Sequence, residues 1–288
     1  MNLCYFVSDL HGDRERYRKL LDCMANERPS AVFMGGDLTG PLGMPLIPQA
    51  GEHGVDSLNG GLVALFRSWK GTLKQYYPKL FVILGNDDPR TEESVLIDAA
   101  SQGYCEYVHN RKASFEEFTV YGYSHVPPTP FLNKDWERYD VSRYVDPGSV
   151  SPETGGRTVP VSASKVRHTT IKNDLEALVR KDNLENAILL FHSPPYKTKL
   201  DIADLLGKKV DHVPLDIHVG SIAIERFLRA KKPRIALHGH VHESPRLSGS
   251  WQDRIGRTFL FSAAHVGPEL ALVRFSPHSP HLATRDLI

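Results

Sequence analysis

Short apolar runs recur along the chain, and each is bounded by glycine, proline or other turn-forming residues. Several runs are almost continuously hydrophobic, which is typical of strands covered on both faces. These runs predict strands at residues 3–7, 31–34, 80–84, 118–121, 187–191, 235–237, 258–262 and 270–275. The segments between them predict helices at residues 14–26, 61–75, 92–102, 164–179, 202–206 and 221–230. This alternation predicts α/β layers around one or two sheets.

Two regions depart from regular alternation. The last two predicted strands are joined only by residues 263–269, so we expect this end of the chain to be antiparallel. Residues 125–161 are rich in proline and glycine and predict a long irregular loop. Loops of this length are usually functional or mobile, with a plain surface insertion as the alternative. We therefore expect a single domain over residues 1–288 that carries this loop as an insertion.

Polar residues directly follow five of the predicted strands, usually beside a glycine. The five segments are SDLHGD at 8–13, GGD at 35–37, GNDD at 85–88, HSPP at 192–195 and HGHVH at 238–242. Ligands of open α/β sheets bind at the carboxyl ends of the strands. A single ending of this kind is more often a helix cap, but five together are hard to explain in that way.

The side chains at these strand ends predict a metal site. They supply carboxylate, amide and imidazole groups and no thiolate, which suits Mn²⁺, Fe²⁺, Zn²⁺ or Mg²⁺. The candidate ligands are Asp9, His11, Asp37, Asn86, His192, His240 and His242. Seven ligands are too many for one ion, whereas two ions that share a bridging carboxylate would use them all.

Composition argues against several other classes of function. Lys plus Arg number 35 and Asp plus Glu number 34, so a net charge of +1 gives no electrostatic support for a nucleic-acid or membrane partner. Cys4, Cys23 and Cys105 have no CxxC spacing, which argues against a disulfide framework and a thiolate zinc site. The sequence shows neither a signal peptide nor an apolar run of membrane-spanning length, and we expect a cytoplasmic protein. Its oligomeric state stays open.

The five blocks resemble, in order and strand context, the motifs of the calcineurin-like metallophosphoesterases. They are DLH at 9–11, GD at 36–37, GND at 85–87, the lone His192 and GHVH at 239–242. The resemblance covers most of the chain and implies a four-layer α/β/β/α sandwich, with two mixed β-sheets and a metal site at the carboxyl ends of the strands. HSPPYKTKLD, the HVGS at 218–221 and GHVHES are similar to the Icc-related predicted phosphoesterases of bacteria and archaea.

The resemblance also implies how the ligands divide between two divalent ions. Asp9, His11 and His242 would bind one ion, and Asn86, His192 and His240 would bind the other. Asp37 would bridge the two. Mn²⁺ or Fe²⁺ is favoured as the native metal, with Zn²⁺ and Mg²⁺ as alternatives.

Other residues are expected to support catalysis without binding the metals. Asp13 and Asp88 are placed to orient the ligand histidines by hydrogen bonds, without binding metal themselves. His218, in the HVGS segment, is a candidate for contact with substrate phosphate, and His125, in the irregular loop, is a second.

Asp87 departs from the family pattern. Family members commonly carry a histidine here, thought to protonate the leaving alcohol. A carboxylate close to two cations has a lowered pKa and is a poor acid at neutral pH. Asp87 could therefore be an acid in an unusual environment, a contact for substrate or a third cation, or a residue without a chemical role. We favour the last two interpretations over the first.

The function predicted is a dinuclear metal-dependent phosphoesterase that hydrolyses a phosphodiester or small organic phosphate by attack of a metal-bridging hydroxide. A protein phosphatase is disfavoured, because those relatives carry GDxxDRG where this chain reads GDLTGPLG. The alternative is a binding or scaffold protein that keeps the fold but has lost catalysis. Retention of all seven candidate ligands argues against that alternative.

Overall fold

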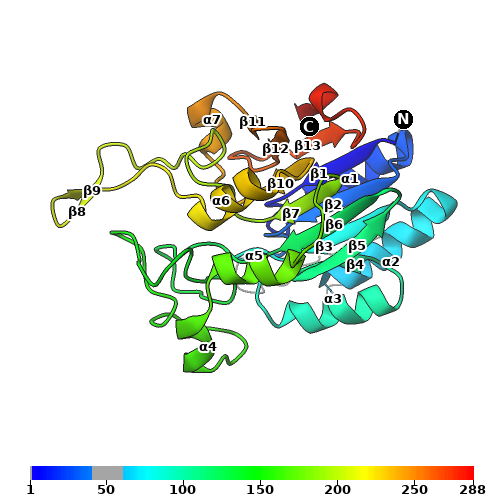
Figure 1. Cartoon of the computed structure of the whole chain (residues 1–288). Coiled ribbons are helices and arrows are strands. Elements are labelled where there is room, and N and C mark those ends of the chain that lie inside the picture. The colour runs from blue at the N-terminus through cyan, green and yellow to red at the C-terminus, as the bar shows by residue number, and fades with distance from the viewer. Residues whose placement is uncertain (1, 41–60) are drawn as a thin grey trace.

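The computed structural model describes residues 2–40 and 61–288 (Figure 1). Its strands form two six-stranded sheets and one separate hairpin. In spatial order, the first sheet contains β14 (Thr284–Leu287), β13 (Ala271–Phe275), β1 (Cys4–Val7), β2 (Ala31–Gly35), β3 (Lys79–Ile83) and β4 (Glu106–Tyr107). The second contains β11 (Gln252–Ile255), β12 (Thr258–Ser262), β10 (Ile235–His238), β7 (Ala187–Phe191), β6 (Phe118–Tyr123) and β5 (Arg111–Phe115). The hairpin pairs β8 (Lys209–Val210) with β9 (Val213–Pro214).

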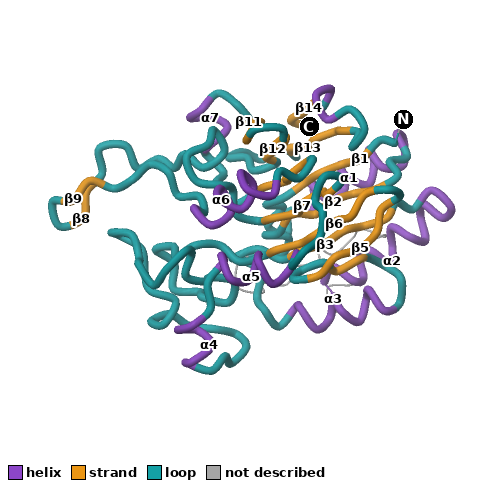
Figure 2. The backbone as a smooth tube through the Cα atoms, viewed as in Figure 1, coloured by secondary structure: helices purple, strands orange, loops and turns teal. Residues whose placement is uncertain are grey.

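Both sheets are mixed, as predicted. Strands β1 to β4 are parallel to one another, and so are β12, β10, β7 and β6. The remaining strands, β13, β14, β11 and β5, pair antiparallel. Because neighbouring parallel strands end at the same edge, the strands that precede the five polar segments deliver them to one end of the molecule. Figure 2 shows the long loops gathered at one end of the sheets.

Five helices cover the outer faces of the sheets: α1 (Arg14–Glu27), α2 (Gly61–Leu73) and α3 (Glu92–Ser101) on the first, and α5 (Ile171–Val179) and α6 (Ile222–Lys231) on the second. The short helices α4 (Ala163–His168) and α7 (Ser244–Ser248) and the 3₁₀ turns at Lys74–Tyr76 and Pro280–Leu282 complete the helical elements of the described residues. Among the described residues, no helix is long and apolar enough to cross a membrane. Cys4, Cys23 and Cys105 are free thiols.

The buried side chains divide into layers. In β1, Cys4 and Phe6 belong to the core between the two sheets, whereas Tyr5 and Val7 belong to the core shared with α1, α2 and α3. On the other side, α5 and α6 pack on the second sheet, where Leu189 lies in their common core. The order helix, sheet, sheet, helix confirms the predicted four-layer sandwich.

Several expected elements differ from the structure. Residues 164–179 form two helices, because Thr169 and Thr170 are extended and Thr170 caps α5 by accepting a bond from the Asn173 N–H. Residues 202–206 form no helix, and Ile202 instead makes a β-bridge with His218. Residues 263–269 cross from one sheet to the other, so β12 and β13 do not pair, although β13 is antiparallel to β1.

Candidate metal centre

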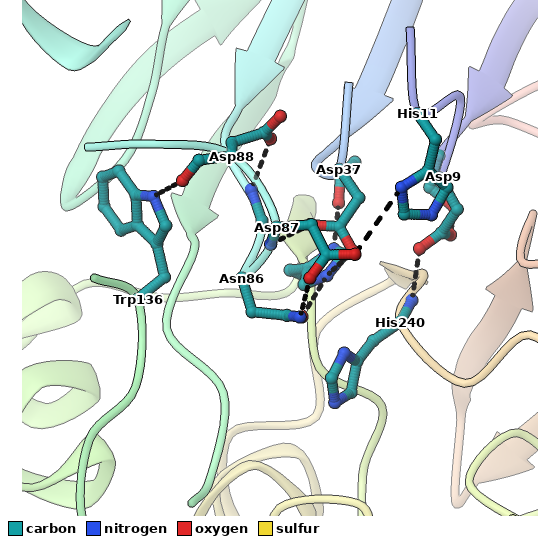
Figure 3. A network of polar contacts seen from close by, with 12 residues as sticks. Asp9, His11, Asp37, Asn86, Asp87, Asp88, Trp136 and His240 are labelled. Carbon is teal, nitrogen blue, oxygen red and sulfur yellow. Dashed lines mark hydrogen bonds and ion pairs between the residues drawn. The ribbon is translucent and has the colours of Figure 1, made fainter. Parts of the chain in front are cut away.

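The seven candidate ligands converge at the carboxyl ends of β1, β2, β3, β7 and β10. Ligand atoms of Asp9, His11, Asp37 and His242 all lie within 4.8 Å of one another. A second group, consisting of Asp37, His192 and His240, meets the same limit. Asn86 joins the second group, since its Oδ1 lies 3.0 Å from Nε2 of His192. Asp37 belongs to both groups, which is the arrangement that a bridging ligand requires (Figure 3).

Distances between neighbouring donor atoms fit ligands of a common ion. The two Nε2 atoms of His11 and His242 are 3.1 Å apart, and His242 Nε2 is 3.2 Å from Asp9 Oδ1. In the second group, His192 Nε2 is 3.2 Å from Asp37 Oδ2. Two donors that each bind one ion at about 2.1 Å lie roughly 3.0 to 3.4 Å apart in octahedral or tetrahedral geometry. The residues present therefore fit divalent metal ions.

Backbone groups fix the ligands in place. Nδ1 of His192 lies 2.8 Å from the Gly35 carbonyl oxygen, so it carries the proton that bonds this oxygen and leaves Nε2 free to bind metal. The N–H of His240 donates to Oδ1 of Asp9 at 3.0 Å, and the N–H of Asp87 donates to Oδ1 of Asp37 at 2.8 Å. Each of these carboxylates is thus held by the backbone of another ligand segment.

Four candidate ligands have left-handed backbone conformations. Their φ angles are 56° at Asp9, 49° at His11, 51° at Asp37 and 75° at His240. Residues other than glycine adopt this conformation uncommonly, and such strain gathers at functional sites. The chain therefore bends sharply at these strand ends, and the bends turn the side chains toward one another.

The carboxylates make the site favourable for positive charge. Burial disfavours the charged form of His192, but Asp37 and Asp9 outweigh this effect and raise its pKa to about 10. Burial, together with the nearby His192, lowers the pKa of His240 to about 3, so this imidazole is a neutral potential ligand. The pKa of Asp9 is lowered despite burial, because His242 and His192 lie close by. A cation bound at Nε2 of His192 would take the place of its proton.

Asp13 and Asp88 do not have the contacts expected of residues that orient histidines. Oδ1 of Asp13 accepts the N–H groups of Glu15 and Arg16 and so caps α1. Asp88 is buried and accepts the N–H groups of Leu38, Thr39 and Gly85 at 2.7 to 2.9 Å. Within the described part of the chain neither carboxylate bonds a ligand histidine. Asp88 instead ties the segment after Asp37 to the segment before Asn86.

Asp87 lies beside the cluster and is partly open to solvent. Its side chain is 40% exposed, and its Oδ2 is 3.6 Å from Nδ1 of His11. Its Oδ1 accepts a hydrogen bond from Nδ2 of Asn86 at 3.0 Å. Burial and the nearby Asp37 raise its pKa, so the protein groups alone do not produce the lowered pKa that we expect beside cations. Figure 3 shows Asp87 next to Asp37 and Asn86.

His218 lies outside both ligand groups. It precedes α6, and its Nδ1 is 2.9 Å from Oδ1 of the buried Asp201. Asp201 also accepts the N–H groups of Lys197, Thr198 and Gly220, and is therefore held rigidly. Because Nδ1 is engaged, His218 has Nε2 left for other contacts. Asp201 is 17 residues away from His218 in the sequence, so their pairing depends on the fold.

Comparison with known proteins gives a family match and a partial match to one relative. The model of the calcineurin-like phosphoesterase family matches residues 4–244. An uncharacterised protein of Methanocaldococcus jannaschii is 38% identical over 80 residues, which span 27% of this chain and 31% of that protein. The match thus covers less than a third of that relative's length.

Solved structures show a similar fold at low sequence identity. The protein TT1561 of Thermus thermophilus is 14% identical with a TM-score of 0.57, over 99% of this chain and 98% of that one. A phosphopantetheinyl hydrolase from Mycobacterium tuberculosis is 11% identical with a TM-score of 0.52, over 92% and 89% of the two chains. A dimetal phosphatase from Danio rerio is 11% identical with a TM-score of 0.51, over 95% and 91%. At these identities the likeness concerns the fold.

Proposed function

The chain belongs to the calcineurin-like phosphoesterase family, and on that basis we propose that it hydrolyses a phosphodiester or small organic phosphate with two divalent metal ions. The observation that carries this proposal is the membership of Asp37 in both ligand groups. One ion would be held by Asp9, His11 and His242, the other by Asn86, His192 and His240. Mn²⁺ or Fe²⁺ is the favoured occupant, with Zn²⁺ and Mg²⁺ as alternatives, since oxygen and imidazole nitrogen donors suit all four ions.

The chain's own groups would perform defined parts of the reaction. Divalent ions at this position supply Lewis-acid activation of water and of a phosphoryl oxygen. Gly35 fixes the tautomer of His192, and Asp88 holds the Asp37 and Asn86 segments at a constant separation. The carboxylate of Asp87 is partly exposed beside the ligand cluster, which supports a role in substrate contact.

An assay of the metal-loaded protein tests the function. We expect elemental analysis to find about two ions per chain after loading with Mn²⁺, in accord with two ligand groups. We also expect hydrolysis of bis(p-nitrophenyl) phosphate to be faster than that of p-nitrophenyl phosphate, and EDTA to stop both reactions. A chain that binds stoichiometric metal but hydrolyses neither ester, nor a panel of nucleotides, would support the scaffold alternative.

Replacement of Asp87 tests how the leaving group is protonated. We expect Asp87→His to raise turnover for alkyl phosphodiesters, whose leaving groups need a proton, and to change turnover of aryl phosphodiesters little. Asp87→Asn is the matched control, because it keeps the size of the side chain and adds no proton donor at neutral pH. Equal effects of Asp87→His on both substrate types would show that position 87 does not control protonation of the leaving group.

His218 is a second candidate for substrate contact, since Asp201 orients it and 23% of its side chain is exposed. The same two substrate types distinguish its role. His218→Ala slows only alkyl phosphodiesters if His218 supplies the proton, and an equal loss on both types excludes that role.

A further inference from the structure

The irregular loop of residues 125–161 is attached to the segment that carries Asn86. Nδ2 of Asn133 donates to the carbonyl oxygen of Asn86 at 3.1 Å, and Nε1 of Trp136 donates to that of Asp88 at 2.8 Å (Figure 3). The N–H of Arg90 donates to Oδ2 of Asp135 at 2.9 Å. These bonds fix the loop relative to the segment that carries Asn86, so a site built into the loop has a defined position relative to the candidate metal centre.

A small basic pocket lies between this loop, Arg90 and α4. Its cationic lining residues are Arg90, Lys134, Arg138, Arg157 and Lys165, against the two carboxylates of Asp135 and Glu137. The pocket is partly open, and its cavity of about 20 Å³ has room for roughly one water-sized group. The cavity can therefore take one oxygen of an oxyanion, with the remainder of the ligand at its mouth.

Three of these cations already have carboxylate partners. Nζ of Lys134 lies 2.6 Å from Oε2 of Glu137, and Nη1 of Arg138 lies 2.7 Å from Oδ1 of Asp174. Nε of Arg90 donates to Oε2 of Glu93 at 3.2 Å. Ion pairs such as these hold the pocket walls in place.

The remaining two cations are not neutralised in this way. Nη2 of Arg157 donates to the carbonyl oxygen of Pro152, which carries no charge, and Lys165 has no ion pair within residues 2–40 and 61–288. Burial lowers the pKa of Arg157, although Asp135 and Glu137 oppose this effect. The pocket therefore has a surplus of positive charge that an anion would offset.

His125 adds a buried polar group without a partner. It lines the pocket and is 1% exposed, and among the described residues its Nδ1 has no hydrogen-bond partner. Burial and the charge of Arg138 keep its pKa well below the usual range, so the ring is neutral and has one N–H to donate. A buried polar atom without a hydrogen-bond partner is destabilising, which points to a ligand that Nδ1 of His125 would contact.

We propose that Arg157, Lys165 and His125 form an anion subsite that takes an oxyanion, either a phosphate or a carboxylate, on a second anionic group of the substrate. Arginine suits this ligand, because its planar guanidinium can donate two parallel bonds to phosphate or carboxylate oxygens. The subsite rests on the proposed function and deepens it: preferred substrates are small organic phosphates that carry a further negative group. Free inorganic phosphate has the same chemistry and serves as the probe.

Phosphate titration tests the subsite separately from catalysis. Calorimetry of the Mn²⁺-loaded full chain is expected to show two classes of phosphate site, of which one survives treatment with EDTA. Arg157→Gln and Lys165→Gln each weaken the surviving class about tenfold, the effect of losing roughly 1.4 kcal/mol of a charge-assisted bond. Lys181→Gln is the matched control, since Lys181 is exposed and does not line the pocket. Unchanged phosphate affinity in both pocket variants overturns the proposal.

Kinetics then distinguish a substrate group from a free anion. Arg157→Gln is expected to raise KM about tenfold for a p-nitrophenyl phosphodiester with a carboxylated alcohol, with little change in kcat, and to leave bis(p-nitrophenyl) phosphate unaffected. Weakened phosphate binding with no change in KM for either ester overturns the substrate assignment and leaves a site for a free anion. If the wild-type protein hydrolyses no ester but keeps the EDTA-resistant site, the proposed function fails and the anion site stands.

Discussion

Asp37→Ala is expected to abolish hydrolysis and to remove both metal ions, more completely than the loss of any other candidate ligand. Asp37 contributes to both ligand groups, whereas each of the other six belongs to one. Loss of a residue that only hydrogen-bonds to a metal ligand typically lowers metal affinity or activity 10- to 100-fold. Loss of a ligand shared by two ions should therefore lower turnover at least about 1,000-fold. Elemental analysis and the turnover of bis(p-nitrophenyl) phosphate measure the two effects.

Asp13→Asn is the control for this variant. Asp13 caps α1, and asparagine caps helices about as well as aspartate, so stability should be nearly unchanged. Metal content and turnover should also match those of the wild-type protein. Loss of metal from Asp13→Asn would contradict the capping role, and full metal content in Asp37→Ala would contradict the bridging role.

The convergence of the ligands could be predicted from sequence because it depends on local features. Apolar runs marked β1, β2, β3, β7 and β10, and a polar segment follows each of them directly. Parallel neighbours place these ends at one edge, so spatial proximity follows from strand order. The structure brings together all seven residues predicted to bind metal, such as Asp9 and His242, which are far apart in the chain.

Other features could not be predicted, because they depend on distant contacts. Strands β11 and β14 read QDRI and TRDL, which have no apolar alternation, and they form only by pairing at the edges of existing sheets. β12 and β13 were expected to be antiparallel, but they lie in different sheets, and Phe261 and Phe275 contact each other across the core between the sheets. The short spacing between the two strands in the sequence does not reveal this separation.

The roles of Asp13 and Asp88 show a similar limit. Both are carboxylates close to ligand residues, a placement that suggested contact with histidines. Their partners are backbone N–H groups and, for Asp88, also the Thr39 hydroxyl. Backbone N–H groups occur in every segment of the chain. The choice among them depends on where two loops approach each other in space.

Gly85→Ala is expected to disrupt the arrangement of the candidate metal ligands, although it adds only one methyl group. A Cβ at this position would lie 2.3 Å from Oδ1 of Asp37, 2.5 Å from the Asp37 backbone nitrogen and 2.7 Å from Cε1 of His192. Two of these three atoms belong to candidate ligand side chains that are already buried, and the third is backbone, so none can move aside freely. Overpacking of this kind typically costs about 1 to 3 kcal/mol. We expect a loss at the upper end of that range, with metal content and turnover lost together.

Gly71→Ala provides a matched comparison, because it makes the same chemical change at a position away from the metal centre. Gly71 lies in α2, and a Cβ there would meet no atom within 4 Å. Alanine should stabilise the helix by about 0.5 to 1 kcal/mol and leave metal binding unchanged. Urea unfolding and elemental analysis of both variants test the pair. If the Gly85→Ala variant kept the stability and metal content of the wild-type protein, the close packing of Gly85 against Asp37 and His192 would not explain why glycine precedes Asn86.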